Sequence, residues 1–462
     1  MRLTSLFLGA FLLLFCGQLA VAQTTVIESD NTAAFNKAHD LFHKQKYAAA
    51  QSAFLRYING ANNAQLVSDA RYYISVCAAE LMLNNTVEKT LMFRDADPIN
   101  TRNAKSKFTL GQYYFRLKNY HAALFEFIQI EPLVSLNPYE NEAYYFMTGY
   151  CQFVEGNLNE ARAYFDEIKD YQNEYYHLAN YFAAYVSFQN KEYDKALKGF
   201  KRIHKHNNFK DFVPIYIAEV YAYNKQYDLV ISYGDSILQN NALQKKHVVH
   251  LLLAQAYFKK QDFKQAVKYY SKYADLRTLG TEDSYQYGYA CYVLKDYNTA
   301  QKQFKSFVID QDSLGQNVSY LLADTYVKNK LKNEARNSFL FASRLDFNKL
   351  IKEDAFYNYA KLSHELKFNK AAMNAFNEFI KTYPNSQYAD EAKVNYTRIL
   401  LSSNDNLKAL ELIEEIPNPN KKIQGGYQRL AFNVGLEYLD IQNFEKAREY
   451  LNKSLKKPVI GE

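Results

Sequence analysis

Histidine pairs are the first residues whose spacing suggests chemistry. His39 and His43 are four residues apart, and His247 and His250 are three apart, so each pair would lie on one face of a helix. Such a pair can hold a metal ion, but a zinc site needs a third protein ligand, and the sequence identifies none for either pair. The His-Lys-His run at 204–206 lies near an expected turn and gives the same result. We therefore predict no metal or other cofactor and interpret these histidines as ordinary surface or groove side chains.

Catalytic motifs are equally hard to find. The chain has no Gly-rich phosphate loop, no His-Glu-x-x-His sequence and no Gly-x-Ser-x-Gly elbow. Acidic residues are scattered, as on solvated helix faces. Because no nucleophile, base and orienting group converge, we predict that the protein is not an enzyme.

The first 22 residues have the pattern of a secretory signal peptide. Arg2 is followed by an apolar run at 6–15 and a small-x-small cleavage site at Ala20-Val21-Ala22, before Gln23. A lipoprotein modified at Cys16 and a retained anchor are the alternatives. Both are disfavoured, because a large Phe precedes the cysteine and the apolar run is too short to span a bilayer. We expect export, and no transmembrane segment in the mature chain.

Charge and cysteine content narrow the function classes. The formal net charge of +7 falls to +6 without Arg2, and no block of Lys and Arg is present, so a nucleic-acid partner is not expected. Export leaves an odd number of cysteines, Cys77, Cys151 and Cys291, each inside an expected helix. We interpret them as buried packing residues rather than as a disulfide or a metal cluster.

Small residues twelve positions apart recur along the chain. Ala254 and Ala266 are an example, with Tyr257 three residues after the first and Tyr270 four after the second. We interpret the stretch as two helices that cross closely at the small residues. One such pair cannot bury its own apolar face, so copies must stack. Only 15 Gly and 8 Pro in the chain also favour helices over strands.

Twelve such units account for nearly all of the mature chain, with a mean step of about 36 residues. Units two and eleven are degenerate. The paired small-residue positions are 38 and 50, 75 and 87, 111 and 123, 149 and 161, 184 and 196, 218 and 230, 254 and 266, 288 and 300, 323 and 335, 360 and 372, 397 and 409, and 435 and 447. An aromatic residue four positions after the second small residue is expected to pack inward: Phe54, Phe127, Phe165, Phe200, Tyr270, Phe304, Phe339 and Phe376.

This pattern resembles the tetratricopeptide repeat (TPR) family. The unit at 352–385 carries Ala360, Ala372, Phe376 and Pro384 at the positions where the family has small, small, large and often Pro residues. The resemblance implies an all-α fold, a TPR-type α-solenoid of about twelve antiparallel helix pairs in a right-handed superhelix with a concave groove. We divide the chain into a signal peptide at 1–22, a polar lead-in at 23–31 and a solenoid at 32–462.

The stretch 416–426 holds two prolines and a Gly-Gly pair. It is either a hinge or a long loop between repeats, and the loop is favoured because Gly435 and Ala447 resume the pattern directly.

The resemblance also implies where a partner would bind. In the family, the fifth and ninth positions of each first helix face the groove, and here they carry many aromatic residues. The predicted groove residues are Phe108, Phe146, Tyr150, Tyr181, Tyr185, Tyr285, Tyr289, Tyr320, Asp324, Tyr357 and Lys361, with Phe432 at the fifth position of the last unit. Two interpretations stay open. The rings pack on neighbouring repeats and stiffen the solenoid, or they bind an extended peptide or a partner helix.

The leading functional hypothesis is an exported scaffold that assembles or tethers an envelope complex by binding proteins. We place it in the periplasm or at the outer-membrane periphery of a Gram-negative bacterium. Its composition and its Ala-Gln cleavage junction look like those of exported TPR proteins of the Bacteroidetes. One alternative is a periplasmic peptide- or glycan-binding protein that uses a Tyr-lined groove. Another is the non-catalytic arm of a longer protein.

Overall fold

The computed structural model describes residues 30–131, 136–305, 312–401, 406–416 and 421–456, and within these ranges the chain is entirely helical. Twenty-four helices of the described residues form twelve consecutive antiparallel pairs, so the predicted all-α fold with twelve units is confirmed. The chain divides into two compact units, and we call 1–203 the first unit and 204–462 the second unit. A numbered unit, such as unit two or unit eleven, is a single helix pair. The right-handed path of the whole solenoid stays a prediction, as does the signal peptide at 1–22, which lies outside the described residues.

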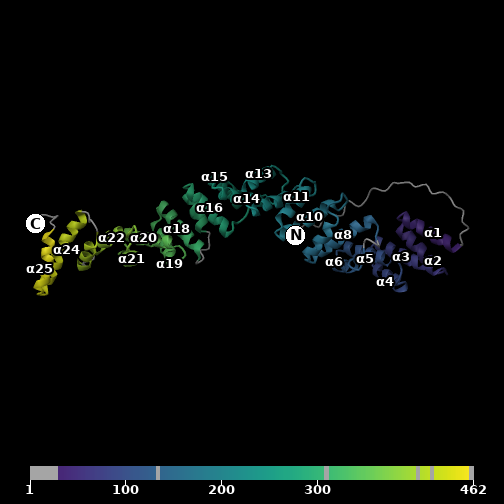
Figure 1. Ribbon diagram of the computed structural model, residues 1–462, viewed down its shortest axis with the longest axis horizontal. Helices are drawn as coiled ribbons and strands as arrows, with labels where there is room; N and C mark the ends of the chain where they lie inside the picture. The colour runs from purple at the N-terminus through teal and green to yellow at the C-terminus, as the bar shows by residue number, and fades with distance from the viewer. Residues whose placement is uncertain (1–29, 132–135, 306–311, 402–405, 417–420, 457–462) are drawn as a thin grey trace. The chain divides into compact units, whose positions relative to one another are not determined.

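The first unit contains five helix pairs, which follow one another along the chain in the purple to blue part of Figure 1. Its first helix begins at Asp30, two residues before the predicted start of the solenoid. The pairs are α1 (Asp30–His43) with α2 (Tyr47–Ile58), α3 (Ala64–Glu80) with α4 (Thr86–Ala96), α5 (Asn103–Arg116) with α6 (Tyr120–Phe127), α8 (Pro138–Val154) with α9 (Leu158–Asp166), and α10 (Tyr176–Gln189) with α11 (Tyr193–Ile203).

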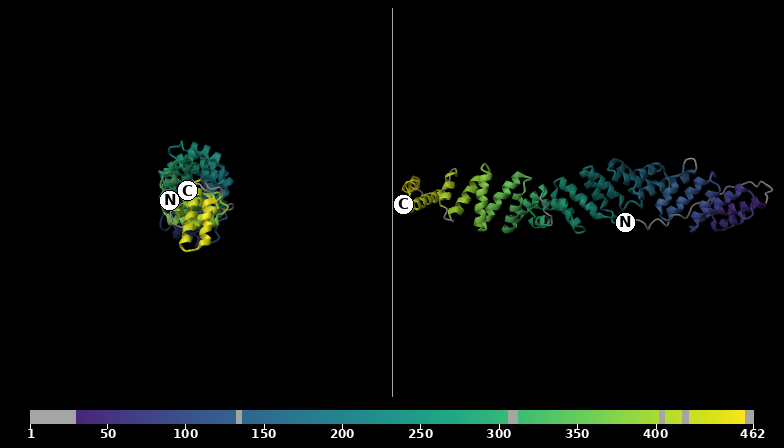
Figure 2. Two further views of the ribbon diagram at one scale, coloured as in Figure 1. Left: turned by 90° about the vertical axis from the view of Figure 1, so that its left-hand side faces the viewer. Right: turned by 90° about the horizontal axis from the view of Figure 1, so that it is seen from below.

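The second unit contains seven helix pairs, and Figure 2 shows its later helices as a row of neighbouring rods. The pairs are α12 (Val213–Tyr223) with α13 (Tyr227–Ile237), α14 (Lys246–Lys259) with α15 (Phe263–Ala274), α16 (Thr281–Val293) with α17 (Tyr297–Lys305), α18 (Ser313–Lys328) with α19 (Lys332–Arg344), α20 (Lys349–Glu365) with α21 (Asn369–Thr382), α22 (Ala389–Leu401) with α23 (Asn406–Glu414), and α24 (Lys421–Asp440) with α25 (Phe444–Lys456).

The interpretation of 416–426 as a loop is wrong for its second half. Helix α24 begins at Lys421 and runs through Gly425 and Gly426, so the Gly-Gly pair lies inside a helix of 20 residues. Gly425 is buried, and this burial explains why a residue of low helix propensity is tolerated there. Residues 417–420 of this stretch lie outside the described residues.

Small residues at the helix crossings do what the spacing predicts. A Cβ atom added at Gly288 in α16 would lie 2.7 Å from Cε1 of Phe304 in α17, so the ring occupies the space of the missing side chain. Gly111 meets Phe127 in the same way. The eight predicted inward aromatics are all buried: Phe54, Phe127, Phe165, Phe200, Tyr270, Phe304, Phe339 and Phe376. In these pairs a small residue therefore faces a large ring.

The degenerate units fold as helix pairs too. In unit two the fully buried side chains of α4 are Thr86, Thr90 and Phe93, whereas the predicted position, Val87, is half-buried. In unit eleven Thr397 and Ala409 are both fully buried, as a well-matched unit would have them. A hydroxyl of the size of a methyl group can fill the small position when it bonds a carbonyl of its own helix, as Thr397 does to Lys393 at 2.8 Å.

The three cysteines Cys77, Cys151 and Cys291 are buried and free, as expected of packing residues. Burial raises the pKa of each thiol to about 12, so each stays protonated and unreactive near neutral pH.

The turns inside the helix pairs share one backbone feature. The second residue after the first helix adopts a left-handed conformation with positive φ in eleven of the pairs, and apart from Gly156 these residues are not glycines. They are Gln45, Met82, Lys118, Lys191, Lys225, Gln261, Lys295, Lys330, Lys367 and Gln442. This conformation reverses the chain tightly between two antiparallel helices, and it is unfavourable for any residue with a Cβ atom.

Candidate interaction surface

The predicted groove residues are carried by α5 and by the first helices of six further units, and their burial differs. Phe108 of α5, Phe146 of α8 and Tyr357 of α20 are buried, Phe432 of α24 is exposed, and the rest are half-buried. We call the half-buried set the first-helix surface: Tyr150, Tyr181, Tyr185, Tyr285, Tyr289, Tyr320, Asp324 and Lys361.

The three buried rings serve packing. Phe108 lies 6.0 Å from Phe127 of its own pair, and Phe146 stacks on Tyr175 at 4.7 Å between ring centroids. Tyr357 stacks on Tyr388, just before α22, at 4.4 Å with the rings nearly parallel. For these three positions the packing interpretation holds in the structure described.

In the first unit, the half-buried tyrosines stand among other rings. Tyr150 contacts Phe115, Tyr120 and Phe182, at 5.3 to 5.6 Å between centroids. Tyr181 and Tyr185 lie side by side along α10, 6.1 Å apart. Each ring therefore presents only part of its surface, held in one orientation by its neighbours.

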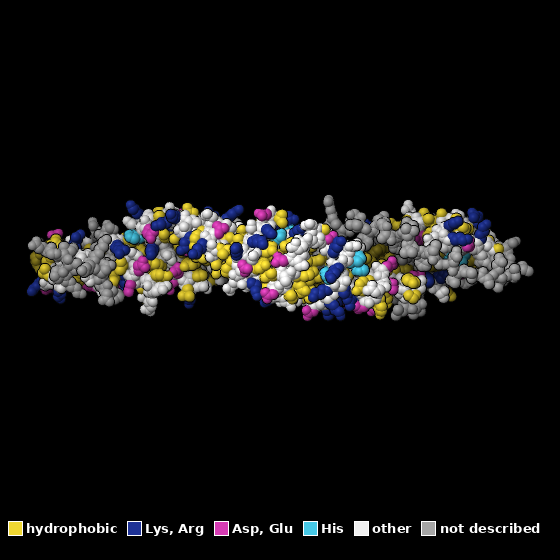
Figure 3. Space-filling model, turned by 90° about the horizontal axis from the view of Figure 1, so that it is seen from above, with side chains coloured by type: hydrophobic (Ala, Val, Ile, Leu, Met, Phe, Trp, Pro, Cys, Tyr) yellow, Lys and Arg dark blue, Asp and Glu magenta, His cyan; other side chains and the backbone are white. Residues whose placement is uncertain are grey.

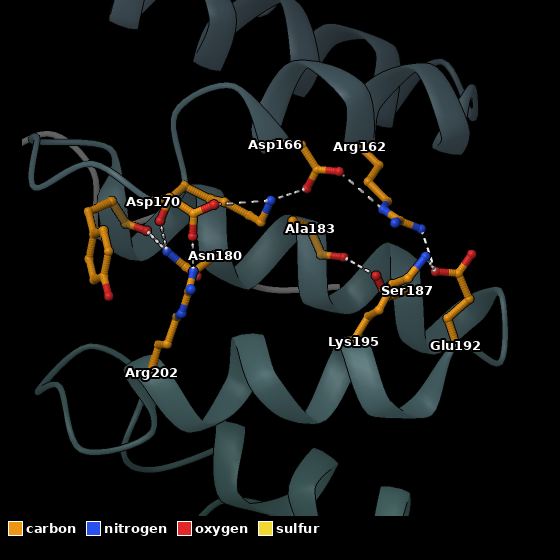
Figure 4. Close-up of polar contacts among 11 residues, drawn as sticks. Arg162, Asp166, Asp170, Asn180, Ala183, Ser187, Glu192, Lys195 and Arg202 are labelled. Atoms are coloured by element: carbon orange, nitrogen blue, oxygen red, sulfur yellow. Dashed lines mark hydrogen bonds and ion pairs between the residues drawn. The ribbon is translucent and has the colours of Figure 1, made fainter.

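In another part of the first unit, polar side chains join α9, α10 and α11 (Figure 4). Arg162 pairs with Glu192 at 2.6 Å, and Arg202 pairs with Asp170 at 2.5 Å. Asn180, fully buried in α10, donates to the Lys169 carbonyl at 2.6 Å. These contacts fix the positions of the three helices, and each of the five side chains named here has a partner, so we assign them a structural role.

In the second unit, Tyr285 and Tyr289 lie along α16 with rings 6.1 Å apart. Asn317 of the next first helix, α18, donates to the Tyr285 hydroxyl at 3.5 Å. The ring of Tyr289 contacts Phe258 and Phe263 of the preceding pair, at 6.1 and 6.0 Å. Consecutive first helices are thus linked through this surface.

An aspartate in α20 organises the middle of the first-helix surface. Asp354 accepts hydrogen bonds from Tyr320 of α18 at 2.5 Å, from Tyr388 before α22, and from Asn358 at 2.9 Å. The bond to Asp354, together with burial, raises the pKa of Tyr388 to about 12. Three units are therefore joined through one carboxylate. The sequence analysis missed Asp354 and Tyr388, although the spacing of 34 residues from Tyr320 to Asp354 and again to Tyr388 was a usable signal.

The two predicted charged residues are also paired. Asp324 accepts from the Tyr292 hydroxyl at 2.7 Å and lies 3.9 Å from Lys328. Lys361 pairs with Glu391 of α22 at 3.2 Å. The Tyr357 hydroxyl and Lys361 lower the pKa of Glu391, so this carboxylate stays ionised at neutral pH. The surface thus offers aromatic faces, hydroxyl groups and charges of both signs, all held by neighbours.

The histidine pairs carry no complete metal site. The Nε2 atoms of His39 and His43 are 3.2 Å apart, and His39 also bonds the Tyr73 hydroxyl at 3.0 Å. His247 and His250 lie at the start of α14. Among the described residues, no group of three or more His, Cys, Asp and Glu side chains could hold a metal ion.

Surface charge and hydropathy add two observations. On the face drawn in Figure 3, Lys and Arg side chains alternate with Asp and Glu side chains rather than gathering in a patch of one sign. Of the helices in the described ranges, none combines the length and apolar character that crossing a membrane would require.

Antiparallel helix pairs stacked on one another define an α-helical repeat protein. Three stretches match the tetratricopeptide repeat family: 248–277 over α14 and α15, 354–386 over α20 and α21, and 428–456 over α24 and α25. The matched stretches are therefore tetratricopeptide repeats, and the other described pairs have the same antiparallel two-helix arrangement. Tetratricopeptide repeats form scaffolds for protein–protein interaction.

Several solved structures are similar to the chain. A tetratricopeptide repeat protein from Parabacteroides merdae is 10% identical, with a TM-score of 0.34, over 56% of this chain and 99% of that one. The C-terminal part of a TPR repeat-containing protein from Cytophaga hutchinsonii is 19% identical, with a TM-score of 0.32, over 53% and 97%. YrrB, a TPR protein with a peptide-binding site described as unusual, is 16% identical, with a TM-score of 0.35, over 43% and 99%. A comparison with curated proteins finds no match.

Proposed function

We propose that this protein is exported and acts as a non-enzymatic scaffold in the periplasm or at the outer-membrane periphery of a Gram-negative bacterium. There it holds together an envelope complex by binding a protein or an extended peptide. The observation that carries the proposal is the first-helix surface, since its partly exposed tyrosines and charges recur on α8 and α10 of the first unit and on α16, α18 and α20 of the second. The signal-peptide pattern at 1–22 supports export.

The state of the tyrosines suits binding. Tyr289 and Tyr185 are each held against other rings, at 5.9 to 6.1 Å, so a partner would not have to order them. A tyrosine offers a large apolar face together with a hydroxyl that can donate and accept. Preorganised side chains of this kind give more affinity per contact than flexible ones.

The scaffold proposal is tested by affinity capture from envelope extracts of the producing organism, with the full mature chain as bait. A stable protein partner should be recovered, and the Tyr285→Ala/Tyr289→Ala variant should bind it about 30-fold or more weakly, since central tyrosines contribute about 2 kcal/mol or more at interfaces. Tyr139→Ala is the control, because Tyr139 is largely exposed at the start of α8, outside the first-helix surface. Failure to recover any stable partner, or equal binding by both variants, contradicts the proposal.

Export has an independent test. Expression of the full chain in a Gram-negative host, followed by fractionation and N-terminal sequencing, should give a mature protein that begins at Gln23. Full-length protein retained in the cytoplasm would contradict export without affecting the scaffold proposal.

Binding of a glycan is the second candidate, and the adjacent rings of Tyr181 and Tyr185 favour it because stacked aromatic faces suit sugar rings. Tyr181→Ala and Tyr285→Ala should then abolish binding of a soluble oligosaccharide without lowering the melting temperature. A lower melting temperature with unchanged binding would assign both rings to packing instead.

A further inference from the structure

The last first helix of the second unit has an apolar stripe that no other described helix covers. Phe432, Leu436 and Leu439 of α24 follow one another at spacings of four and three residues, so they share one face of the helix. Their side chains are 48%, 39% and 44% exposed. Three large apolar residues in one row differ from the single exposed residues that are normal on a protein surface.

Some of the same positions are covered in preceding units. With Gly435 as the eighth position of its unit, Phe432, Leu436 and Leu439 are the fifth, ninth and twelfth. At the fifth position, Phe146 is 8% and Tyr357 2% exposed, beneath rings from the following pair.

Coverage at the twelfth position follows the same rule. Phe42 contacts Tyr73 of α3 at 4.8 Å, and Phe115 contacts Tyr150 of α8 at 5.6 Å. In each case the covering ring belongs to the next first helix. The stripe on α24 therefore occupies positions that in these units pack against the following helix pair.

The charges at the two ends of the stripe indicate which helix fits. Arg429 lies three residues before Phe432 and Asp440 directly follows Leu439, so a positive charge stands at one end and a negative charge at the other. Both side chains are exposed, and among the described residues neither has an ion-pair partner. A helix that packs antiparallel on α24 should place a negative charge near Arg429 and a positive charge near Asp440. A second copy of α24, running in the opposite direction, does so.

A two-fold axis beside Leu436 makes the face self-complementary. Reversal of the second copy about this axis sets Phe432 opposite Leu439 of the second copy and brings the two Leu436 side chains together. Arg429 then falls about two residues, or ~3 Å along the axis, from Asp440 of the second copy, a distance that an arginine side chain spans. The contact is isologous, so one Arg429–Asp440 pair forms at each end of the stripe.

We infer that two copies of this chain associate through α24, with Phe432, Leu436 and Leu439 packed antiparallel and two Arg429–Asp440 pairs at the ends. The inference goes beyond the proposed scaffold role, because it concerns a surface outside the first-helix surface set and a partner of known sequence. A dimer of this kind would present two copies of the first-helix surface in one particle.

The first test measures the mass of the full mature chain by light scattering coupled to size exclusion, over a range of concentrations. The wild type should reach twice the mass of one chain, and Leu436→Asp should remain monomeric, because the substitution places two carboxylates at the two-fold axis. The control is Leu276→Asp, since Leu276 is a comparably exposed leucine after α15. A monomeric wild type, or a dimer that survives Leu436→Asp, overturns the inference.

The second test reads the direction of the pairing. Arg429→Asp or Asp440→Arg alone should weaken the dimer about 3- to 30-fold, since each places like charges together at both ends. The double variant Arg429→Asp/Asp440→Arg should restore it, because the pairs reform with reversed sign. Equal loss in the single and double variants excludes antiparallel self-pairing. Self-pairing is also excluded if the chain is monomeric on its own and binds a different protein that the Leu436→Asp variant no longer binds.

A third measurement separates loss of folding from loss of association. Leu436→Cys should form a disulfide between two copies under mild oxidation, whereas Leu276→Cys should not. The native cysteines of the described residues are buried and should not interfere. Helix content and melting temperature of every variant are compared with the wild type, and since Leu436 is partly exposed in the single chain they should change little.

Discussion

Lysine occupies a left-handed backbone position at six of the turns inside helix pairs. At Lys295 and Lys330 φ is 64° and 62°, a region that costs a residue with a Cβ atom about 1–2 kcal/mol. Neither side chain makes an ion pair with another described residue that could offset this cost. The turn geometry is therefore imposed by the packing of the two helices.

Glycine at these turns should stabilise the protein. Lys295→Gly and Lys330→Gly should each raise the free energy of unfolding by a few tenths of a kcal/mol to about 1 kcal/mol, because relief of strain exceeds the gain in unfolded-state entropy. Urea denaturation followed by circular dichroism measures the change. In the exposed helical position Lys264, the same substitution should destabilise by about 1 kcal/mol. Destabilisation at the turns would show that the lysine side chains contribute more than the strain costs.

A second residue-scale effect concerns pH. Burial, followed by the nearby charges of His43 and Arg102, lowers the pKa of His39 below its usual 6.5. The unfolded chain then binds a proton more readily than the folded one, so the stability that neutral His39 contributes is complete above the unfolded-state pKa. It is lost as the pH falls through the folded-state pKa.

His39→Gln should therefore flatten the pH dependence of stability. Between pH 8 and pH 5 the melting temperature of this variant should fall less than that of the wild type, because one proton-linked loss is removed. His121→Gln serves as the control, since the His121 side chain is largely exposed. A wild-type slope in both variants would show that His39 does not contribute.

At the scale of the element, the helix pair depends on the close approach at its crossing. In Gly288→Ala the gain in helix propensity is about 1 kcal/mol, but overpacking against Phe304 costs about 1–3 kcal/mol. We expect net destabilisation in urea titrations. Partial recovery is expected in Gly288→Ala/Phe304→Leu, where the smaller side chain makes room. Gly60→Ala should be nearly neutral, because nothing lies within 4 Å of the added atom.

How far sequence reasoning reaches can be judged from particular elements. The positions of α14 and α15 could be predicted from Ala254 and Ala266, because a small residue in each helix at the crossing is a signal that depends only on nearby sequence. In α4, however, the buried face begins at Thr86 rather than Val87, since threonine can fill the small position when its hydroxyl donates to a nearby carbonyl, here that of Leu83 just before the helix. The Gly425-Gly426 pair misled the prediction because helix packing overrides propensity.

The first-helix surface was predicted by residue type but not by contact. The half-buried tyrosines lie on the first helices as the resemblance implied, yet their bonds run between units. Tyr320 bonds Asp354 across 34 residues, and such a partner depends on the exact step between two repeats. Whether these rings bind a partner depends on how much of each ring is exposed to solvent, and that exposure cannot be predicted from the sequence alone.

At the scale of the whole molecule, stability should be a sum over pairs and their joints. Phe304→Ala should cost ~3–5 kcal/mol through the cavity it leaves, and in a stack where each pair contacts only its neighbours this local loss should separate unfolding into two transitions. Thermal melts followed by circular dichroism, with hydrogen exchange to locate the early transition, check the result. Phe347→Ala, at an exposed position, should leave a wild-type curve. One unbroken transition in Phe304→Ala would mean that coupling extends well beyond neighbouring pairs.

The lysines in left-handed turns also mark positions along the chain at which a protease can cut the native protein. Trypsin cleaves after lysine where the backbone can leave its native path, and these six lysines stand exposed in tight turns while most others lie in helices that must first unwind. Brief digestion of the native protein should therefore cut at intervals of one or two repeats between Lys118 and Lys367, so that mass spectrometry reads the repeat step from the fragment masses.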